Sequence, residues 1–428
     1  MIDYKDTICK FRLIPNSLTI CITIFYVLLN TEEALKLLFV TARFPWPLDK
    51  GDKLRAYNQL KYLSRHHEIA LFAISEQRIN KDWIEALSPF CKKIKVIRLS
   101  RFRVLLNIVS GIFTSLPLQS IYYFNSQISE ELKMFSFKER PGKIIFQLVR
   151  TTLYARMFNT KDCIIDLMDC MSYHYFLRYK NSSFFKQIFY YREYIRLKRY
   201  EIALLNRYPD ILIISKKDKS LLPGIKKKVH VIGNGVEIHE IQKSTLKNVD
   251  VLFLGNLRYQ PNIRAAKFII AAILPLLKKA DPNIRVCIAG IAANQLKTGQ
   301  LKNLQLLENV EHTLPLFKSS QVFVAPMFLS TGIQNKILEA VVARIPVVTT
   351  PNAADAIGLI NGVHVLTAIS PQEFNDQIIH LLSNARLRTL LIENAYEFVQ
   401  RHCNWEKNIK LMGNIINNST RIMEAAES

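Results

Sequence analysis

The sequence predicts an α/β protein built from two doubly wound domains that face each other across a cleft. Three observations lead to this fold class. Apolar, strand-like runs alternate with stretches of helical spacing from Leu35 onward, which is typical of parallel sheets covered by helices. The alternation stops over the polar residues 235–249 and then starts again. The length of 428 residues suits two domains of about 200 residues each.

The first series of apolar runs predicts a parallel sheet in a domain at 35–234. The helical stretch after the first run places Leu54, Tyr57, Leu60 and Leu63 near one face. The strand-like runs are 35–43, 68–75, 93–100, 143–149, 162–169, 209–215 and 228–234.

The second series predicts a domain at 250–370, joined to the first by the linker 235–249. We expect the helical segment 371–417 to pack across both domains and residues 418–428 to form a tail. Ligands of such sheets bind outside the carboxyl ends of the strands, so two facing domains would place a site between them. The strand-like runs are 250–256, 284–290, 321–326 and 345–350.

Residues 1–34 precede the first convincing strand. The run 18–29 is apolar except for two threonines and follows basic residues, as in a signal peptide, but it lacks a small-residue cleavage pattern. It is also too short to cross a bilayer. We interpret 1–34 as an extension outside the fold, either an artefact of an upstream start codon or a weak membrane anchor.

An excess of basic residues gives the chain a formal net charge of +23. Such a charge attracts nucleic acid, an anionic membrane leaflet or phosphate-bearing small molecules. The sequence has neither zinc-finger spacing nor an RNA-binding signature, which argues against nucleic acid. The seven cysteines lack the spacing of a disulfide framework and indicate buried thiols in a reducing compartment.

The segment 324–350 has the most informative pattern, in which a strand, a loop, a helix and a strand follow one another. Gly332 lies where the loop meets the helix, and a glycine there lets a ligand approach the backbone. The helix N-terminus offers free N–H groups and partial positive charge to a phosphate.

Lys336 and Glu339 lie on one face of that helix. A lysine there would add charge against a diphosphate, and a carboxylate would accept hydrogen bonds from a ribose diol. The alternative interpretation is an exposed Lys–Glu pair on a surface helix.

Residues 332–348, GIQNKILEAVVARIPVV, resemble the donor-binding motif of GT-B glycosyltransferases, in the family of retaining group 1 (family 4 type) enzymes. The chain is similar to sugar transferases associated with exopolysaccharide and exosortase (PEP-CTERM) gene clusters, from about Leu35 to about Trp405. The other motifs that support the resemblance are FPWPLDKGDKLRAYNQLKYLSRHHEI (44–69), DLMDCMS (166–172), YREYIRLKRYE (191–201), VIGNGVE (231–237) and FLGNLRYQPNIRAA (253–266).

The resemblance implies that Glu339 binds the donor ribose. It implies further donor-binding residues around the same helix and after the first strand of the second domain. These are Gly332, Ile333, Gln334, Asn335, Lys336, Gly255, Asn256 and Arg258.

The sequence departs from the family pattern at three positions. Thr331 stands where the family has a glutamate that contacts the donor sugar. Asn256 and Pro261 stand where it has an arginine and a lysine that clamp the diphosphate. Lys336 is our candidate for the missing charge and for a catalytic role, and Arg258 and Arg264 are weaker substitutes.

Lys50, Gly51 and Asp52 match the glycine-containing loop that, in the family, lies near the donor phosphates and the acceptor. Gly51 would allow close approach, and Asp52 would orient an acceptor hydroxyl in a catalytic role. The alternative is an ordinary turn with solvated charges. Arg55 follows in the same segment and is a candidate for the same loop.

Two further candidates for the acceptor site follow the strand-like run 162–169. Asp166 and Asp169 end that run, and we favour a role for Asp169 in capping the next helix. His174 loosely matches a family histidine that faces the donor sugar, and a solvated or core histidine is the favoured alternative. Asn234 and Gly235 suit a tight turn with a structural role.

Two basic and aromatic stretches, 101–124 and 176–201, bear on the acceptor. Each is either a core helix with a solvated basic face or a surface for an anionic leaflet. The resemblance implies an acceptor site in the first domain, which suits a polyprenyl-phosphate-linked saccharide.

The implied activity is transfer of a sugar from a nucleotide-diphosphate sugar to a saccharide acceptor, with retention, in the synthesis of exopolysaccharide or a related surface glycan. We expect no metal and no cofactor, no nucleic-acid partner, and a cytoplasmic protein peripheral at the inner face of the cytoplasmic membrane. The alternatives are a non-hydrolysing nucleotide-sugar epimerase, which shares this fold, and a nucleotide-binding scaffold with weakened catalysis.

Overall fold

The computed structural model describes residues 34–224, 229–237, 248–296, 301–308, 310, 313–328 and 332–427, the last ten of these by their backbone. The predicted extension 1–34 lies outside the described residues except for Ala34. No helix of these residues is both long and apolar enough to span a membrane.

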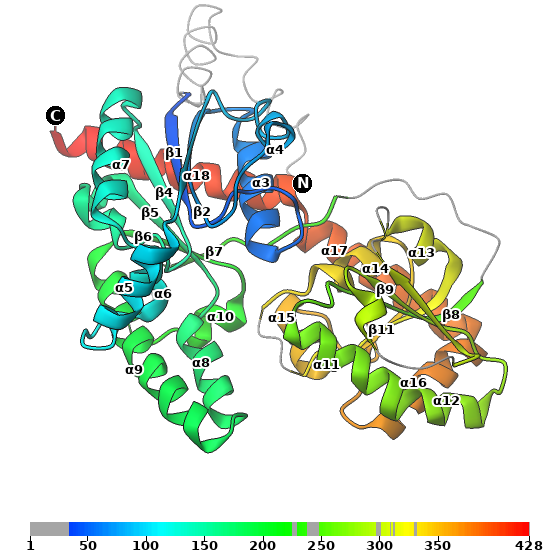
Figure 1. Cartoon of the computed structure of the whole chain (residues 1–428). Coiled ribbons are helices and arrows are strands. Elements are labelled where there is room, and N and C mark those ends of the chain that lie inside the picture. Colours follow the sequence, from blue (N-terminus) through cyan, green and yellow to red (C-terminus); the bar gives the residue numbers. More distant parts are fainter. Residues whose placement is uncertain are drawn as a thin grey trace, which may run out of the picture.

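Two fully parallel sheets form the frame of the molecule, as Figure 1 shows. The first has the strand order β3-β2-β1-β4-β5-β6-β7 and the second the order β10-β9-β8-β11-β12-β13. The first comprises β1 (Lys36–Thr41), β2 (Glu68–Ser75), β3 (Lys93–Arg98), β4 (Lys143–Gln147), β5 (Cys163–Met168), β6 (Asp210–Ile213) and β7 (Val229–Val231). The second comprises β8 (Val249–Leu254), β9 (Val286–Gly290), β10 (Leu304–Glu308), β11 (Ser320–Ala325), β12 (Val347–Thr349) and β13 (Leu366–Thr367).

Both sheets are doubly wound, which confirms the predicted fold class. The strand order reverses between β1 and β4 in the first sheet and between β8 and β11 in the second. At such a reversal the connecting segments leave in opposite directions, so a crevice opens outside the carboxyl ends of the two strands. The segments that follow these four strands are therefore the places to look for a site.

Every strand-like run of the sequence contains a strand, and two strands were not predicted. β10 lies at the sheet edge, and its side chains are half-buried or exposed, so it lacks the apolar run of a central strand. β13 has two residues, too few to produce a periodic pattern.

Helices cover both sheets. Those of the first sheet are α3 (Gly51–Leu63), α4 (Lys81–Glu85), α5 (Arg101–Gly111), α6 (Leu118–Tyr123), α7 (Ser126–Glu139), α8 (Met171–Lys180), α9 (Phe184–Arg207) and α10 (Lys216–Leu221). Those that follow are α11 (Gln260–Phe268), α12 (Leu274–Ala280), α13 (Leu314–Ser319), α14 (Asn335–Val342), α15 (Pro351–Ile357), α16 (Pro371–Ser383), α17 (Ala385–His402) and α18 (Trp405–Glu427).

The last two helices belong to different cores. Leu391 and Val399 of α17 are buried in the core of the second sheet. Trp405 and Met412 of α18 are buried in the core on one face of the first sheet, where α18 packs against α3. In Figure 1 the two helices run from behind the second sheet to the first. The C-terminal segment thus crosses back to the half of the molecule where the chain began.

The chain passes between the two sheets twice, and the two passages touch. The N–H of Val236 donates to the carbonyl of Cys403 at 2.9 Å, and Val236 forms a bridge with Asn404. Asn234 and Gly235 form no turn here, contrary to the prediction. A glycine is required at 235 for a different reason, because a Cβ there would lie 2.2 Å from the backbone N of Trp405.

We predict that Gly235→Ala lowers the free energy of unfolding by about 1–3 kcal/mol, since the clash is with backbone that cannot rotate away. Urea denaturation would measure the change. Gly413→Ala in α18 is the matched control, because none of the described atoms outside its own helix turn lies within 4 Å of its Cβ position. It should stabilise by about 0.5–1 kcal/mol through helix propensity. Equal stability of Gly235→Ala and wild type would contradict the close contact.

Candidate functional site

The segment after β8 packs tightly against the end of β9. Gly290 has a φ of +135°, and a Cβ on it would lie 2.1 Å from the carbonyl oxygen of Gly255. A Cβ on Gly255 would in turn lie 3.2 Å from Nζ of Lys336. Two glycines therefore let the backbone at the carboxyl edge of the second sheet approach the lysine of α14.

Lys336 points back onto this edge instead of into solvent. Its Nζ lies 2.5 Å from Oδ1 of Asn262 and 5.0 Å from the ring centroid of Phe253. Burial lowers the pKa of Lys336 to about 7, and it raises the pKa of Glu339 to about 7. Both side chains are half-buried and Nζ of Lys336 is held on the edge of the sheet, so the alternative of an exposed surface pair is wrong.

Asn256 and Arg258 differ in what their side chains contact. Oδ1 of Asn256 accepts from the N–H of Arg258 at 3.0 Å, and its carbonyl accepts from Nδ2 of Asn262 at 2.9 Å. Asn256 thus shapes the loop that ends β8. The side chain of Arg258 is exposed and extends from that loop.

The start of α14 lies beside open space. A Cβ on Gly332 would meet no described atom within 4 Å. Gln334 precedes the first helical residue and donates to the carbonyl of Gly332 at 3.2 Å, while Ile333 packs on the second core. A role for these residues in donor binding stays a prediction. Thr331 lies outside the described residues.

Asp52 lies in the first turn of α3, directly outside the end of β1. Its Oδ2 accepts from Nη1 of Arg43 at 2.6 Å and lies 3.8 Å from Nη1 of Arg150. Asp52 is therefore placed between two arginines and is not a solvated turn residue. Arg43 and Arg150 were missed in the sequence, although each follows one of the two strands at the reversal, β1 and β4.

The residues next to Asp52 contribute less to the site. The side chain of Lys50 is exposed as a whole, and partial desolvation of its ammonium group together with the positive charge of Arg43 lowers its pKa. A Cβ on Gly51 would meet Met168 at 3.5 Å, an ordinary contact, so the described structure does not require a glycine there.

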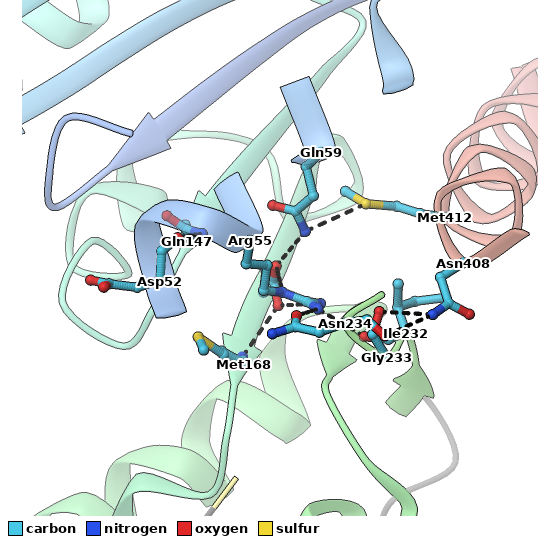
Figure 2. A network of polar contacts seen from close by, with 11 residues as sticks. Asp52, Arg55, Gln59, Gln147, Met168, Ile232, Gly233, Asn234, Asn408 and Met412 are labelled. Atoms are coloured by element: carbon cyan, nitrogen blue, oxygen red, sulfur yellow. Dashed lines mark hydrogen bonds and ion pairs between the residues drawn. The ribbon is translucent and has the colours of Figure 1, made fainter. Parts of the chain in front are cut away.

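Arg55 is the centre of a buried network, which Figure 2 shows. Its Nε donates to Oδ2 of Asp166 at 2.8 Å and its Nη2 to Oδ1 at 3.1 Å. Its Nη1 donates to the carbonyl of Ile232 at 2.9 Å and to Oδ1 of Asn234 at 3.1 Å. Because both side chains are fully buried, the prediction that Arg55 lies in an acceptor loop is wrong.

The network reaches the second sheet through Asn234. Its Nδ2 donates to Oδ1 of Asn335, the first residue of α14, at 3.4 Å. Its carbonyl accepts from Nδ2 of Asn408 in α18 at 3.1 Å. Asn335, predicted as a donor-binding residue, is thus also in contact with the first half of the molecule.

Asp169 and His174 lie near each other after β5, with 3.5 Å between Nε2 and Oδ2. Burial, with the charges of Asp52 and Asp166, raises the pKa of Asp169 to about 7, and burial lowers the pKa of His174 to about 4. Asp169 does not cap α8, whose N-cap is Cys170. Glu201 holds the start of that helix instead, since its Oε1 accepts from the N–H of Ser172 at 2.9 Å.

Tyr259, after β8, links the two groups of residues. Burial raises its pKa, the charge of Arg178 opposes this rise, and the charges of Asp169 and Asp52 add to it. The loop of the second sheet is therefore within electrostatic reach of the carboxylates at the end of the first. A second contact between the two halves joins α10 and α15, where Nζ of Lys217 lies 3.8 Å from Oδ2 of Asp355. The candidate site is lined from both halves.

Metal-binding side chains do not cluster in threes anywhere in the part of the chain that the structure describes.

Residues 248–384 match the family model described as Glycosyl transferases group 1. A 44.6 kDa protein in the cps region of Klebsiella pneumoniae is 23% identical over 386 residues, which cover 87% of this chain and 97% of that protein. A Methanocaldococcus jannaschii glycosyltransferase is 25% identical over 204 residues, 43% of this chain and 51% of that protein.

Solved structures share the fold at low identity. The sucrose-phosphate synthase of Thermosynechococcus elongatus superposes with a TM-score of 0.66 at 13% identity, covering 92% of this chain and all of that one. WaaG, a glycosyltransferase of lipopolysaccharide biosynthesis, has a TM-score of 0.60 at 13% identity, covering 89% and 99%. Anabaena HepE, solved with UDP and glucose, has a TM-score of 0.55 at 13% identity, covering 90% and 100%.

We predict that Arg55→Met lowers the free energy of unfolding by about 3–5 kcal/mol, because it leaves the Asp166 carboxylate buried without its counter-charge. Urea denaturation would measure the loss. Arg55→Met with Asp166→Leu should recover much of it, and Arg386→Met on the surface of α17 should change it by less than about 0.5 kcal/mol. A stable, folded Arg55→Met protein would show that the pair is not a structural centre.

We predict that the protein takes up about one proton when it binds a nucleoside diphosphate near pH 8. Burial favours the neutral amine of Lys336, and an anion beside it favours the ammonium form. Calorimetric titrations in buffers of different ionisation enthalpy measure this number. It should vanish in Lys336→Met and persist in Lys267→Met, which changes an exposed lysine of α11. The same uptake in both variants would assign the proton to another group.

Proposed function

We propose a specific reaction for this chain, which is a GT-B glycosyltransferase of the group 1 type. The chain transfers a sugar from a nucleotide-diphosphate sugar to a saccharide acceptor in the synthesis of exopolysaccharide or a related surface glycan, with retention. The match to a protein of a cps region supports polysaccharide synthesis. The observation on which the proposal chiefly rests is the position of Lys336 and Glu339, half-buried on α14 with Nζ of Lys336 held against Asn262 at the carboxyl edge of the second sheet.

In the proposed complex the second half of the molecule binds the donor. The Glu339 carboxylate accepts hydrogen bonds from the ribose hydroxyls, and Lys336 with the N-terminus of α14 faces the diphosphate. The open space beside Gly332 admits the ligand to the backbone. Ile333, Gln334, Asn335, Gly255, Asn256 and Arg258 complete this region. The structures of HepE with UDP-glucose and of TarM with UDP support a nucleotide-sugar donor.

The proposed chemistry needs no metal and no cofactor. The bond between the sugar and the diphosphate breaks, and the acceptor oxygen bonds to the sugar carbon on the same face. The diphosphate leaves with the electron pair and accepts the acceptor's proton, so no protein base is needed. Lys336 and the helix dipole stabilise the charge on the leaving group, which is the catalytic contribution of Lys336.

On the first half of the molecule, Asp52 orients the acceptor hydroxyl. Its Oδ2 is occupied by Arg43, so the carboxylate is fixed in position. Asp169 and His174 are the other residues proposed to face the acceptor or the donor sugar. We propose a polyprenyl-phosphate-linked acceptor at the inner face of the cytoplasmic membrane, in keeping with the net charge of +23.

We predict that Glu339→Gln weakens binding of the correct nucleotide-sugar by about 10- to 100-fold, because charged acceptors make the stronger hydrogen bonds. A thermal-shift panel of nucleoside diphosphates and their sugars identifies the ligand, since a ligand of the native state raises Tm. Isothermal titration then gives the Kd of each variant. Glu393→Gln, an exposed carboxylate of α17, is the matched control and should bind as wild type.

Conversion of the donor in the absence of any acceptor would instead indicate an epimerase. Normal donor affinity in a folded Glu339→Gln protein would refute the ribose assignment. A Glu339→Gln protein that shows no thermal shift with the nucleotide-sugar and yet transfers the sugar at the wild-type rate would also contradict the proposal.

A further inference from the structure

The first half of the molecule exposes large apolar side chains on two helices, α5 and α9. Phe113, directly after α5, is 86% exposed, and Phe185 in the first turn of α9 is 84% exposed. Side chains of this size are seldom left in water in such numbers without a partner. The exposed apolar residues here, which we call the α5–α9 surface, are Phe102, Leu105, Leu106, Val109, Ile112, Phe113, Phe184, Phe185, Ile188, Phe189 and Tyr191.

The two helices are fastened to each other, so the surface is one unit. Nη2 of Arg192 donates to the carbonyl of Ile112 at 2.5 Å. Nη2 of Arg196 donates to the carbonyls of Ile112 and Thr114 at 2.8 and 2.7 Å. Both arginines belong to α9 and hold the end of α5 against it. In Figure 1 the two helices lie on the same side of the first sheet.

The exposed charges on the two segments that form this surface have one sign. The acidic residues of 101–124 and 176–201 are Glu193 and Glu201, and both are buried and hydrogen-bonded. The exposed charges of these segments are basic, and they are Arg101, Arg178, Lys180, Lys186, Arg192, Lys198 and Arg199. Such a surface is complementary to an anionic one, and two copies of it would repel each other.

We propose that the α5–α9 surface docks this chain on an anionic bilayer, with its phenylalanines inserted among the headgroups. Aromatic and aliphatic side chains flanked by Lys and Arg are the composition that binds in the interfacial plane of a membrane. The charges attract the chain to the leaflet, and apolar burial holds it there.

The docking surface is connected to the candidate site through α6. The N–H of Leu118, at the start of α6, donates to Oε2 of Glu193 in α9 at 2.9 Å. One residue on, Oε1 of Gln119 accepts from Nε of Arg150, the arginine beside Asp52, at 3.1 Å. One short helix thus joins the surface to the residues proposed to face the acceptor. If the acceptor is lipid-linked, as proposed above, the docked enzyme meets it at the membrane.

The experiment is co-sedimentation of the full chain with vesicles of phosphatidylcholine and phosphatidylglycerol in equal parts, and with vesicles of phosphatidylcholine alone. We expect strong, salt-sensitive binding to the first and weak binding to the second. Phe113→Asp with Phe185→Asp should reduce the partition coefficient by about tenfold or more for each phenylalanine. Arg101→Gln with Lys186→Gln should weaken binding to the anionic vesicles and leave binding to the neutral ones unchanged.

Phe137→Asp is the matched control, because Phe137 is 80% exposed on α7, away from the surface, and should bind vesicles as wild type. Equal binding by Phe113→Asp/Phe185→Asp and Phe137→Asp would overturn the proposal. So would a dimer in light scattering that the double variant dissociates, which would make this face an interface between copies. All these variants should keep the nucleotide-dependent rise in Tm, so failure here is distinguishable from failure of the proposed reaction.

Discussion

A guanidinium and a carboxylate that are both shut off from water, those of Arg55 and Asp166, fix the segment through which the chain leaves the first sheet for the second. Removing two charges from water is costly, and only a full set of hydrogen bonds offsets the cost. Here α3, the end of β5 and the segment 232–234 supply that set. The helix that carries Asp52 is therefore tied to the passage that leads to the second sheet, and through Asn234 to the start of α14.

Lys336 and Glu339 in the second half differ from Arg55 and Asp166 in how their charges are accommodated. Lys336 is withdrawn onto Asn262 and Phe253, and Glu339 lies half-buried one turn further along α14. The pKa values of both groups are shifted toward the neutral form as a result. A buried pair with a full set of hydrogen bonds serves the fold, whereas shifted pKa values at the carboxyl edge of a sheet are typical of binding sites, in keeping with the donor site proposed above.

The sequence was sufficient for the fold because the strands of both sheets are nearly all buried apolar runs, of which Leu37–Thr41 and Val251–Leu254 are typical. The sequence did not predict β10, because this strand lies at the edge of the second sheet and its side chains are half-buried or exposed. Among site residues, the position of Lys336 and Glu339 on one helical face followed from spacing. The burial of Arg55 did not, because its partners lie more than 100 residues away, at Asp166 and Asn234. Arg43 and Arg150 follow the two strands between which the order of the first sheet reverses. The rule that ligands bind outside the carboxyl ends of such strands would have found them.

The contact between Val236 and Cys403 has a mechanical consequence. Because the two passages lie side by side, the halves are joined at one small region, and any change in the angle between them would have to bend both passages there. Gly235 and Trp405 lie in that region, with no room for a side chain between them. The amide contact of Asn234 with Asn335 would lengthen or break in such a movement, so it reports on the arrangement of the halves.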